Sequence, residues 1–239
     1  MVVLITGISF VGYIFIKLMG ARRGILLTGL FGGIVSSTVV TLNFSRMAKE
    51  KDFSNIFAAG ILVASGTMFP RMLLYVLVVN YNLFSHLIIP IVMMTVVAYA
   101  AVLWFLLKGT KIDDSTKRQA IPISNPFQLL PALAYGVLLA AIILLSYTFK
   151  EWFGNKGIYL LSLFSGISDV DAITIALSKL GKSELPAVVV SKAIIIAAMM
   201  NTFVKSLLVA IIAGKSMGIK IFVAFGLIMV SGLIGFLFI

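Results

Sequence analysis

Cysteine is absent, histidine occurs once, and charged side chains are scarce in this chain of 239 residues, where they make up 11%. The lack of cysteine excludes disulfides and thiolate metal sites. With one histidine and no nucleophile spaced to meet a base, the sequence offers no catalytic constellation. We therefore expect a protein that is not an enzyme and that carries no cofactor other than a bound inorganic ion.

A separate basic region is also missing, although the formal net charge is +11. The Lys and Arg residues stand singly or in small clusters between apolar runs, where the loops of membrane proteins usually carry them. This distribution argues against nucleic acid as a partner. It favours a lipid bilayer as the surroundings of the chain.

Apolar residues dominate instead: 61% of the chain is hydrophobic and the mean hydropathy is +1.16. Continuous apolar runs of about 20 residues recur along the whole length, which is the span of a transmembrane helix. Continuous runs favour helices over a barrel, whose strands alternate. The sequence predicts an all-α polytopic protein of the cell membrane, multi-pass in a prokaryotic plasma membrane, with about eight transmembrane segments at 2–18, 24–44, 53–79, 87–107, 126–149, 157–179, 185–213 and 221–239.

The second and sixth segments are similar to each other. Residues 24–46 align with residues 157–179, 133 positions later, and nine of the 23 pairs are identical. A basic residue, Arg71 or Lys205, recurs in the segment that follows each copy. We predict two four-segment repeats, 1–108 and 126–239, joined by a polar linker at 109–125. Four segments per repeat favour repeats that cross in the same direction, whereas one re-entrant segment in each would make them inverted.

Glycines stand inside both copies, at Gly32-Gly33 and at Gly166. Because two glycines in a row fall at a duplicated site, we predict that each copy is a broken helix near the middle of the bilayer. The alternative is that these glycines only permit neighbouring helices to pack closely.

Two carboxylates, Asp169 and Asp171, follow the second break. Residues two apart face opposite sides of a regular helix, so both can reach one ion only where the backbone is irregular. They are interpreted either as metal ligands or proton carriers beside unwound backbone, or as caps of a half-helix that begins at Ser168. A central unpaired charge costs about 2.5–3.5 kcal/mol in a membrane, so we expect the acids to pair with Arg71 and Lys205.

A polar stripe extends from the acids along the helix, because Thr174 and Ser178 share the face of Asp171. The first copy repeats the stripe at Thr38, Thr41 and Ser45. Such a stripe lines an ion path or holds helices together. The predicted ion-path or substrate-binding residues are Ser36, Ser37, Thr38, Thr41, Ser168, Asp169, Asp171, Thr174 and Asn201.

Three runs in the second half resemble a known family: NPFQLLPAL from Asn125, GISDVDAIT from Gly166 and NTFVK from Asn201. The family is the domain of unknown function 4010, which often follows an MgtC/SapB-type domain. GLFGGIVSSTVVT, from Gly29, is similar to its first-half motif. The resemblance covers nearly the whole chain, and we expect the domain to stand alone, without the MgtC-type half. It implies a membrane location and, through the neighbouring domain, ion homeostasis, with an MgtC-type membrane protein as a candidate partner.

These observations predict a membrane transporter or channel for a small inorganic ion. A divalent cation such as magnesium fits best, since carboxylates and hydroxyls are hard oxygen ligands. One alternative is an anion channel or exchanger that uses Arg71, Lys205 and half-helix N-termini. Another is a membrane subunit that transports nothing and docks or regulates a partner. A homodimer is expected, because one duplicated unit is small for a complete pore.

Overall fold

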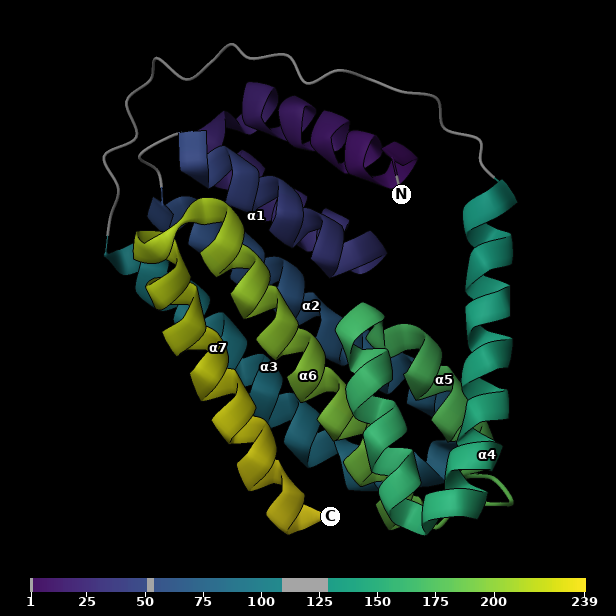
Figure 1. Cartoon of the computed structure of the whole chain (residues 1–239). Coiled ribbons are helices and arrows are strands. Elements are labelled where there is room, and N and C mark those ends of the chain that lie inside the picture. The colour runs from purple at the N-terminus through teal and green to yellow at the C-terminus, as the bar shows by residue number, and fades with distance from the viewer. Residues whose placement is uncertain (1, 51–53, 109–128) are drawn as a thin grey trace. The chain divides into compact units, whose positions relative to one another are not determined.

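A computed structural model of the chain describes residues 2–50, 54–108 and 129–239 (Figure 1). These residues form seven α-helices and two short 3₁₀ helices, and no strand occurs among them. The predicted linker at 109–125 lies outside the described residues. The helices are α1 Val2–Glu50, α2 Ser54–Val79, η1 Tyr81–Leu83, α3 Phe84–Leu107, α4 Leu129–Ser168, α5 Val170–Leu180, α6 Ala187–Ala213, α7 Lys215–Gly235 and η3 Phe236–Phe238.

Five helical stretches in the described part of the chain are long and apolar enough to cross a membrane. The chain is therefore a helical protein of the membrane type, as the sequence predicts. Five of the predicted segments coincide with these stretches, and the count of eight stays a prediction, because 2–18, 126–149 and 157–179 are not among them. The stretches are Arg22–Lys49, Asn55–Val79, Tyr81–Leu107, Ala187–Ala213 and Lys215–Phe238.

The two longest helices, α1 and α4, change direction along their length (Figure 1). Gly20 in α1 has a φ of 80° and Gly154 in α4 a φ of 58°, a left-handed conformation that glycine adopts without steric cost. A second kind of break has extended backbone. It occurs inside α1 at Ser36, with φ −161° and ψ 103°, and between α4 and α5 at Asp169, with φ −158° and ψ 141°.

The position of the first extended break corrects a prediction. The break was expected near Gly32-Gly33, but the backbone leaves helical geometry at Ser36. The glycines stay within the helix because Gly33 is needed for close packing, where a Cβ would lie 2.6 Å from the Cα of Ala64 on α2. Ser36 tolerates the break because a serine can cap the helix that restarts after it.

The described residues fall into two compact units. The first contains residues 2–68, 96–108 and 205–227, and the second contains residues 69–95, 129–204 and 228–239. The chain passes from the first unit into the second along α2 and α7, and from the second into the first along α3 and α6. The boundary between the two predicted sequence repeats stays a prediction.

Each unit has its own apolar core. In the first, Phe44 and Phe57 are buried with ring centroids 5.7 Å apart, next to Gly60. In the second, a Cβ at Gly235 would lie 2.6 Å from Pro90, so α7 and α3 are in close contact there. Small residues at such crossings let helix backbones approach, which is the main source of packing energy between membrane helices.

Candidate ion site at a broken helix

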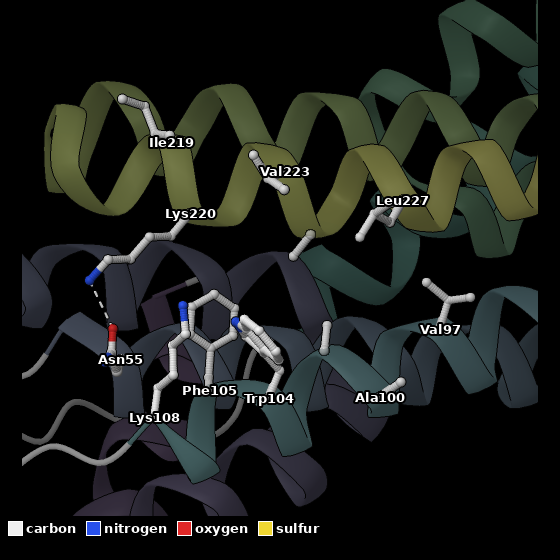
Figure 2. A pocket seen from close by; sticks show the side chains of 12 residues that line it. Asn55, Val97, Ala100, Trp104, Phe105, Lys108, Ile219, Lys220, Val223 and Leu227 are labelled. Atoms are coloured by element: carbon white, nitrogen blue, oxygen red, sulfur yellow. Dashed lines mark hydrogen bonds between the residues drawn. The ribbon is translucent and has the colours of Figure 1, made fainter.

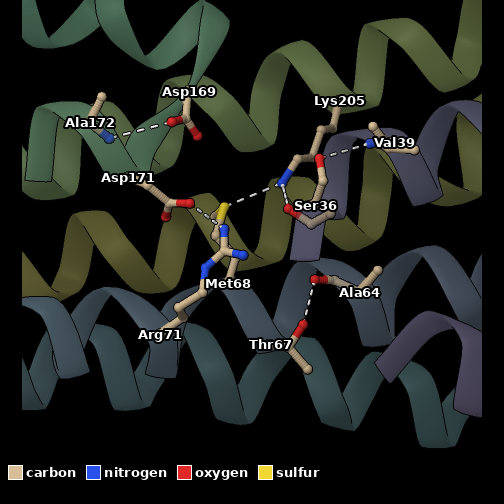
Figure 3. Close-up of polar contacts among 11 residues, drawn as sticks. Ser36, Val39, Ala64, Thr67, Met68, Arg71, Asp169, Asp171, Ala172 and Lys205 are labelled. Atoms are coloured by element: carbon tan, nitrogen blue, oxygen red, sulfur yellow. Dashed lines mark hydrogen bonds and ion pairs between the residues drawn. The ribbon is translucent and has the colours of Figure 1, made fainter. Parts of the chain in front are cut away.

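Asp169 caps the half-helix α5 in the second unit. Its side chain accepts a hydrogen bond from the backbone N–H of Ala172 at 3.4 Å, three residues on (Figure 3). This is the usual geometry of an N-cap, which satisfies one of the free N–H groups at a helix start. The cap was predicted one residue earlier, at Ser168. That residue is instead the last of α4, and it is exposed.

Asp171 forms an ion pair with Arg71 of α2. The Nη2 of Arg71 lies 2.6 Å from the Oδ2 of Asp171, and the two side chains are 13% and 14% exposed (Figure 3). The pair joins residues 100 positions apart within one unit. Asp171 occupies the first turn of α5, where a negative charge also interacts favourably with the helix dipole.

Two hydroxyls follow Asp171 along α5. Thr174 and Ser178 are fully buried, and Thr174 Oγ1 and Ser178 Oγ have no hydrogen-bond partner among the described residues. Burying a hydroxyl without a partner is unfavourable, so such groups mark positions where something polar is bound or where strain is tolerated. The backbone carbonyl of Ser178 accepts a hydrogen bond from Asn80 Nδ2 at 3.2 Å.

Asn201 and Gly166 meet just before this break. Asn201 is buried in α6, and its Nδ2 donates to the carbonyl oxygen of Gly166 at 3.0 Å. A Cβ at Gly166 would lie 2.6 Å from the carbonyl oxygen of Ala197. Gly166 is helical, and the break comes three residues later at Asp169. It therefore serves helix packing, while Asn201 satisfies a carbonyl at the end of α4.

Lys205 is buried in the first unit, where it is 1% exposed. Its Nζ donates to Ser37 Oγ at 2.7 Å and lies 3.2 Å from Met68 Sδ (Figure 3). Ser37 directly follows the extended break of α1 at Ser36. The two predicted cationic residues, Arg71 and Lys205, thus both contact a helix that restarts after a break.

The predicted site residues of the first copy form hydrogen bonds with nearby residues of their own helix. Ser36 Oγ accepts from the N–H of Val39 at 3.4 Å, as Asp169 does from Ala172. Thr41 donates to the carbonyl of Ser37 at 2.8 Å, and Ser45 to that of Thr41 at 2.6 Å. Thr38 is partly exposed and stands where the second copy has Asp171. The first stripe thus carries no acid, and two of its hydroxyls bond to their own helix.

Asp169 and Asp171 were predicted as metal ligands. Within the described residues, no group of three or more His, Cys, Asp or Glu side chains is placed to hold a metal ion. That Asp169 and Asp171 bind a metal ion stays a prediction.

Two contact residues were missed by sequence reasoning. Asn80 and Met68 stand in apolar surroundings without a charge or a repeated spacing to mark them. A buried Asn at the end of an apolar run is the one signal that would have pointed to Asn80.

The family model for the domain of unknown function DUF4010 matches residues 3–213. This chain belongs to the DUF4010 family. A relative of the DUF4010 chain, an uncharacterized protein of Aquifex aeolicus (strain VF5), is 35% identical over 201 residues, which is 82% of this chain and 85% of the relative. No solved structure matches the chain.

Proposed function

We propose that this DUF4010 protein moves a small inorganic cation across the cell membrane, and that magnesium is the first ion to test. The observation that carries the proposal is the Asp171–Arg71 ion pair at the start of a half-helix, beside two buried hydroxyls without partners. Ionisable residues within apolar spans are costly and commonly mark ion paths. Catalysis is not part of the proposal.

The chemistry of this site suits a cation that competes with a resident counter-ion. Asp171 is held by Arg71, so an arriving cation would take the carboxylate and release the guanidinium. Thr174 and Ser178 supply further oxygens on the same face. Magnesium keeps several of its waters and needs few protein ligands, so one or two carboxylates are sufficient.

We further propose that the chain is an internal duplication with eight membrane segments. The extended breaks at Ser36 and Asp169 are 133 positions apart, the same offset that aligns the two sequence copies. Each break is capped by its own side chain through the N–H three residues on. Two unrelated helices would have no reason to share both the position and the cap.

The exchange of helices between the two units is compatible with inverted repeats and with repeats that cross in the same direction. In the aligned repeats, α2 corresponds to α6, yet α2 passes from the first unit into the second and α6 from the second into the first. The basic residues follow the same exchange: Arg71 contacts the broken helix of the second copy, and Lys205 that of the first. Inverted repeats around a shared polar centre are common among transporters.

An anion path is the second candidate, and the burial of Lys205 favours it. A lysine that is 1% exposed and donates to a serine at a helix start resembles an anion-binding position. A homodimer and association with an MgtC-type membrane protein remain part of the proposal, the first on grounds of size and the second through the family's usual neighbour.

Ion flux into proteoliposomes tests the function. We expect uptake of Mg²⁺ in a panel with Ca²⁺, K⁺, Na⁺ and Cl⁻, and a loss of at least tenfold in Asp171→Asn. Asp169→Asn, whose amide still caps α5, reports whether the charge of Asp169 also binds the ion. Glu151→Gln is the matched control, since Glu151 is an exposed acid of the same unit.

Three other outcomes would redirect the proposal. A chloride current that survives Asp171→Asn and disappears in Lys205→Met favours the anion path. Equal magnesium flux in Asp171→Asn and Glu151→Gln would show that the ion does not bind at Asp171 of α5. If the protein is folded and no ion in the panel shows flux, a docking or regulatory subunit is favoured.

A further inference from the structure

The first unit contains an apolar groove with a cationic end, between the end of α3 and the start of α7 (Figure 2). Its volume is about 790 Å³. Most of its wall is hydrocarbon or aromatic, from residues such as Val97, Phe105, Val223 and Leu227. The polar lining residues are Asn55, Lys108 and Lys220, and Figure 2 shows them together at one end of the groove, opposite Val97 and Leu227.

The positions of these groups along their helices fit the interface of a bilayer. Lys108 directly follows α3, and Asn55 is the second residue of α2. Lys220 Nζ donates to Asn55 Oδ1 at 2.8 Å, and Lys108 Nζ lies 4.4 Å from the ring centroid of Trp104. Tryptophan and lysine near helix ends are typical of the headgroup region.

The length of the groove fits one leaflet. Lys108 comes eleven positions after Val97, which is about 16 Å along a helix at about 1.5 Å per residue. Half of a hydrocarbon core of about 30 Å is about 15 Å. A lipid with its phosphate at the lysines would therefore have its acyl chain along Val97, Ala100 and Val223, with the chain end near Leu227.

We propose that this groove binds an anionic phospholipid, its headgroup phosphate at Lys108, Lys220 and Asn55. Charge complementarity selects the occupant: two ammonium groups favour a net negative headgroup over a zwitterionic one, and basic pockets between membrane helices bind such headgroups. The apolar wall selects a lipid over a free phosphate, which would leave most of the groove uncovered. This proposal is independent of the transported ion.

Tryptophan quenching tests it, because the chain has only two tryptophans, Trp104 and Trp152. In a Trp152→Phe background, Trp104 in the groove is the sole tryptophan. We expect phosphatidylglycerol with brominated acyl chains to quench it at lower mole fraction than brominated phosphatidylcholine. Lys108→Gln and Lys220→Gln should each reduce that preference about fivefold. Lys215→Gln, an exposed lysine at the start of α7 that does not line the groove, should leave it unchanged.

A second variant separates binding in the groove from general lipid contact. Ala100→Phe fills the groove without removing a charge, and should weaken quenching by both lipids while far-UV circular dichroism stays unchanged. Equal quenching by the two lipids, or a preference that survives Lys108→Gln/Lys220→Gln, would overturn the proposal. So would loss of the preference on adding inorganic phosphate at constant ionic strength, which would indicate a soluble phosphate as the ligand.

Discussion

Arg71 and Asp171 form an ion pair between distant parts of the chain, and their surroundings determine how much it contributes to stability. The pair is 13% and 14% exposed and lies within apolar helices. In such surroundings the attraction within an ion pair is offset by the cost of removing both charges from water. The ion pair as a whole therefore adds little to the stability of the protein, whereas removing only one of its partners is costly.

Removing one partner should destabilise the protein more than removing both. We expect Arg71→Met and Asp171→Asn each to lower the free energy of unfolding by about 3 kcal/mol, because each removes one partner of a buried ion pair. The double variant should recover at least half of that loss. Reversible unfolding in mixed micelles gives the coupling energy. Additive effects of the two changes would mean that the pair does not act as a unit.

The broken helices explain which parts of the site could be predicted from the sequence. The pairing of Asp171 with Arg71 follows from charges that interrupt apolar runs, since a charge in a membrane helix must be satisfied nearby. The repeat stays a prediction. The location of the first break could not be predicted, because Gly33 is helical and Ser36 is not. The close approach of Thr67 and Ala64 on the neighbouring helix is what requires a glycine at position 33, and no local sequence pattern shows it.

The lysine contacts and the groove could not be predicted for a related reason. Ser37 and Met68 meet Lys205 from two different helices, and no local pattern records which helices become neighbours. The groove depends likewise on where α3 and α7 diverge. Periodicity gives the helices themselves, whereas their crossings depend on packing.

Gly33 should be intolerant of even a methyl group. In Gly33→Ala the new Cβ would lie 2.6 Å from the Cα of Ala64, so α1 and α2 must separate, and we expect a loss of about 1–3 kcal/mol. Gly226→Ala is the control, since a Cβ there meets nothing within 4 Å and alanine favours a helix. Thermal melting in detergent measures both. Equal melting temperatures for the two variants would contradict this packing role.

The two units share their long helices, so that each unit is built from parts of both predicted repeats. The long helices α2, α3, α6 and α7 each contribute to both units. Each unit therefore combines a broken helix from one predicted repeat with a basic residue from the other. Neither repeat alone would then place a basic residue against its own broken helix.

The lack of cysteine makes the topology directly testable. Lys49 lies in the last turn of α1, and Lys182 follows α5. Both are exposed, and they are 133 positions apart. If the repeats are inverted, Lys49→Cys and Lys182→Cys should react with a membrane-impermeant maleimide from opposite faces of sealed, oriented vesicles. Labelling of both from the same face would instead establish repeats that cross in the same direction. The unaltered chain, which has no thiol, gives the background.

The two breaks have different side chains at their helix starts, and this difference affects how many cations one chain could bind. Where the second copy has Asp169 and Asp171, the first has Ser36 and Thr38. Two identical copies would give two acidic sites per chain, with the repulsion between bound cations that follows. With neutral side chains in the first copy, only the second of the two breaks carries acids. If the chain transports a cation as proposed, each transport cycle would carry one cation per polypeptide.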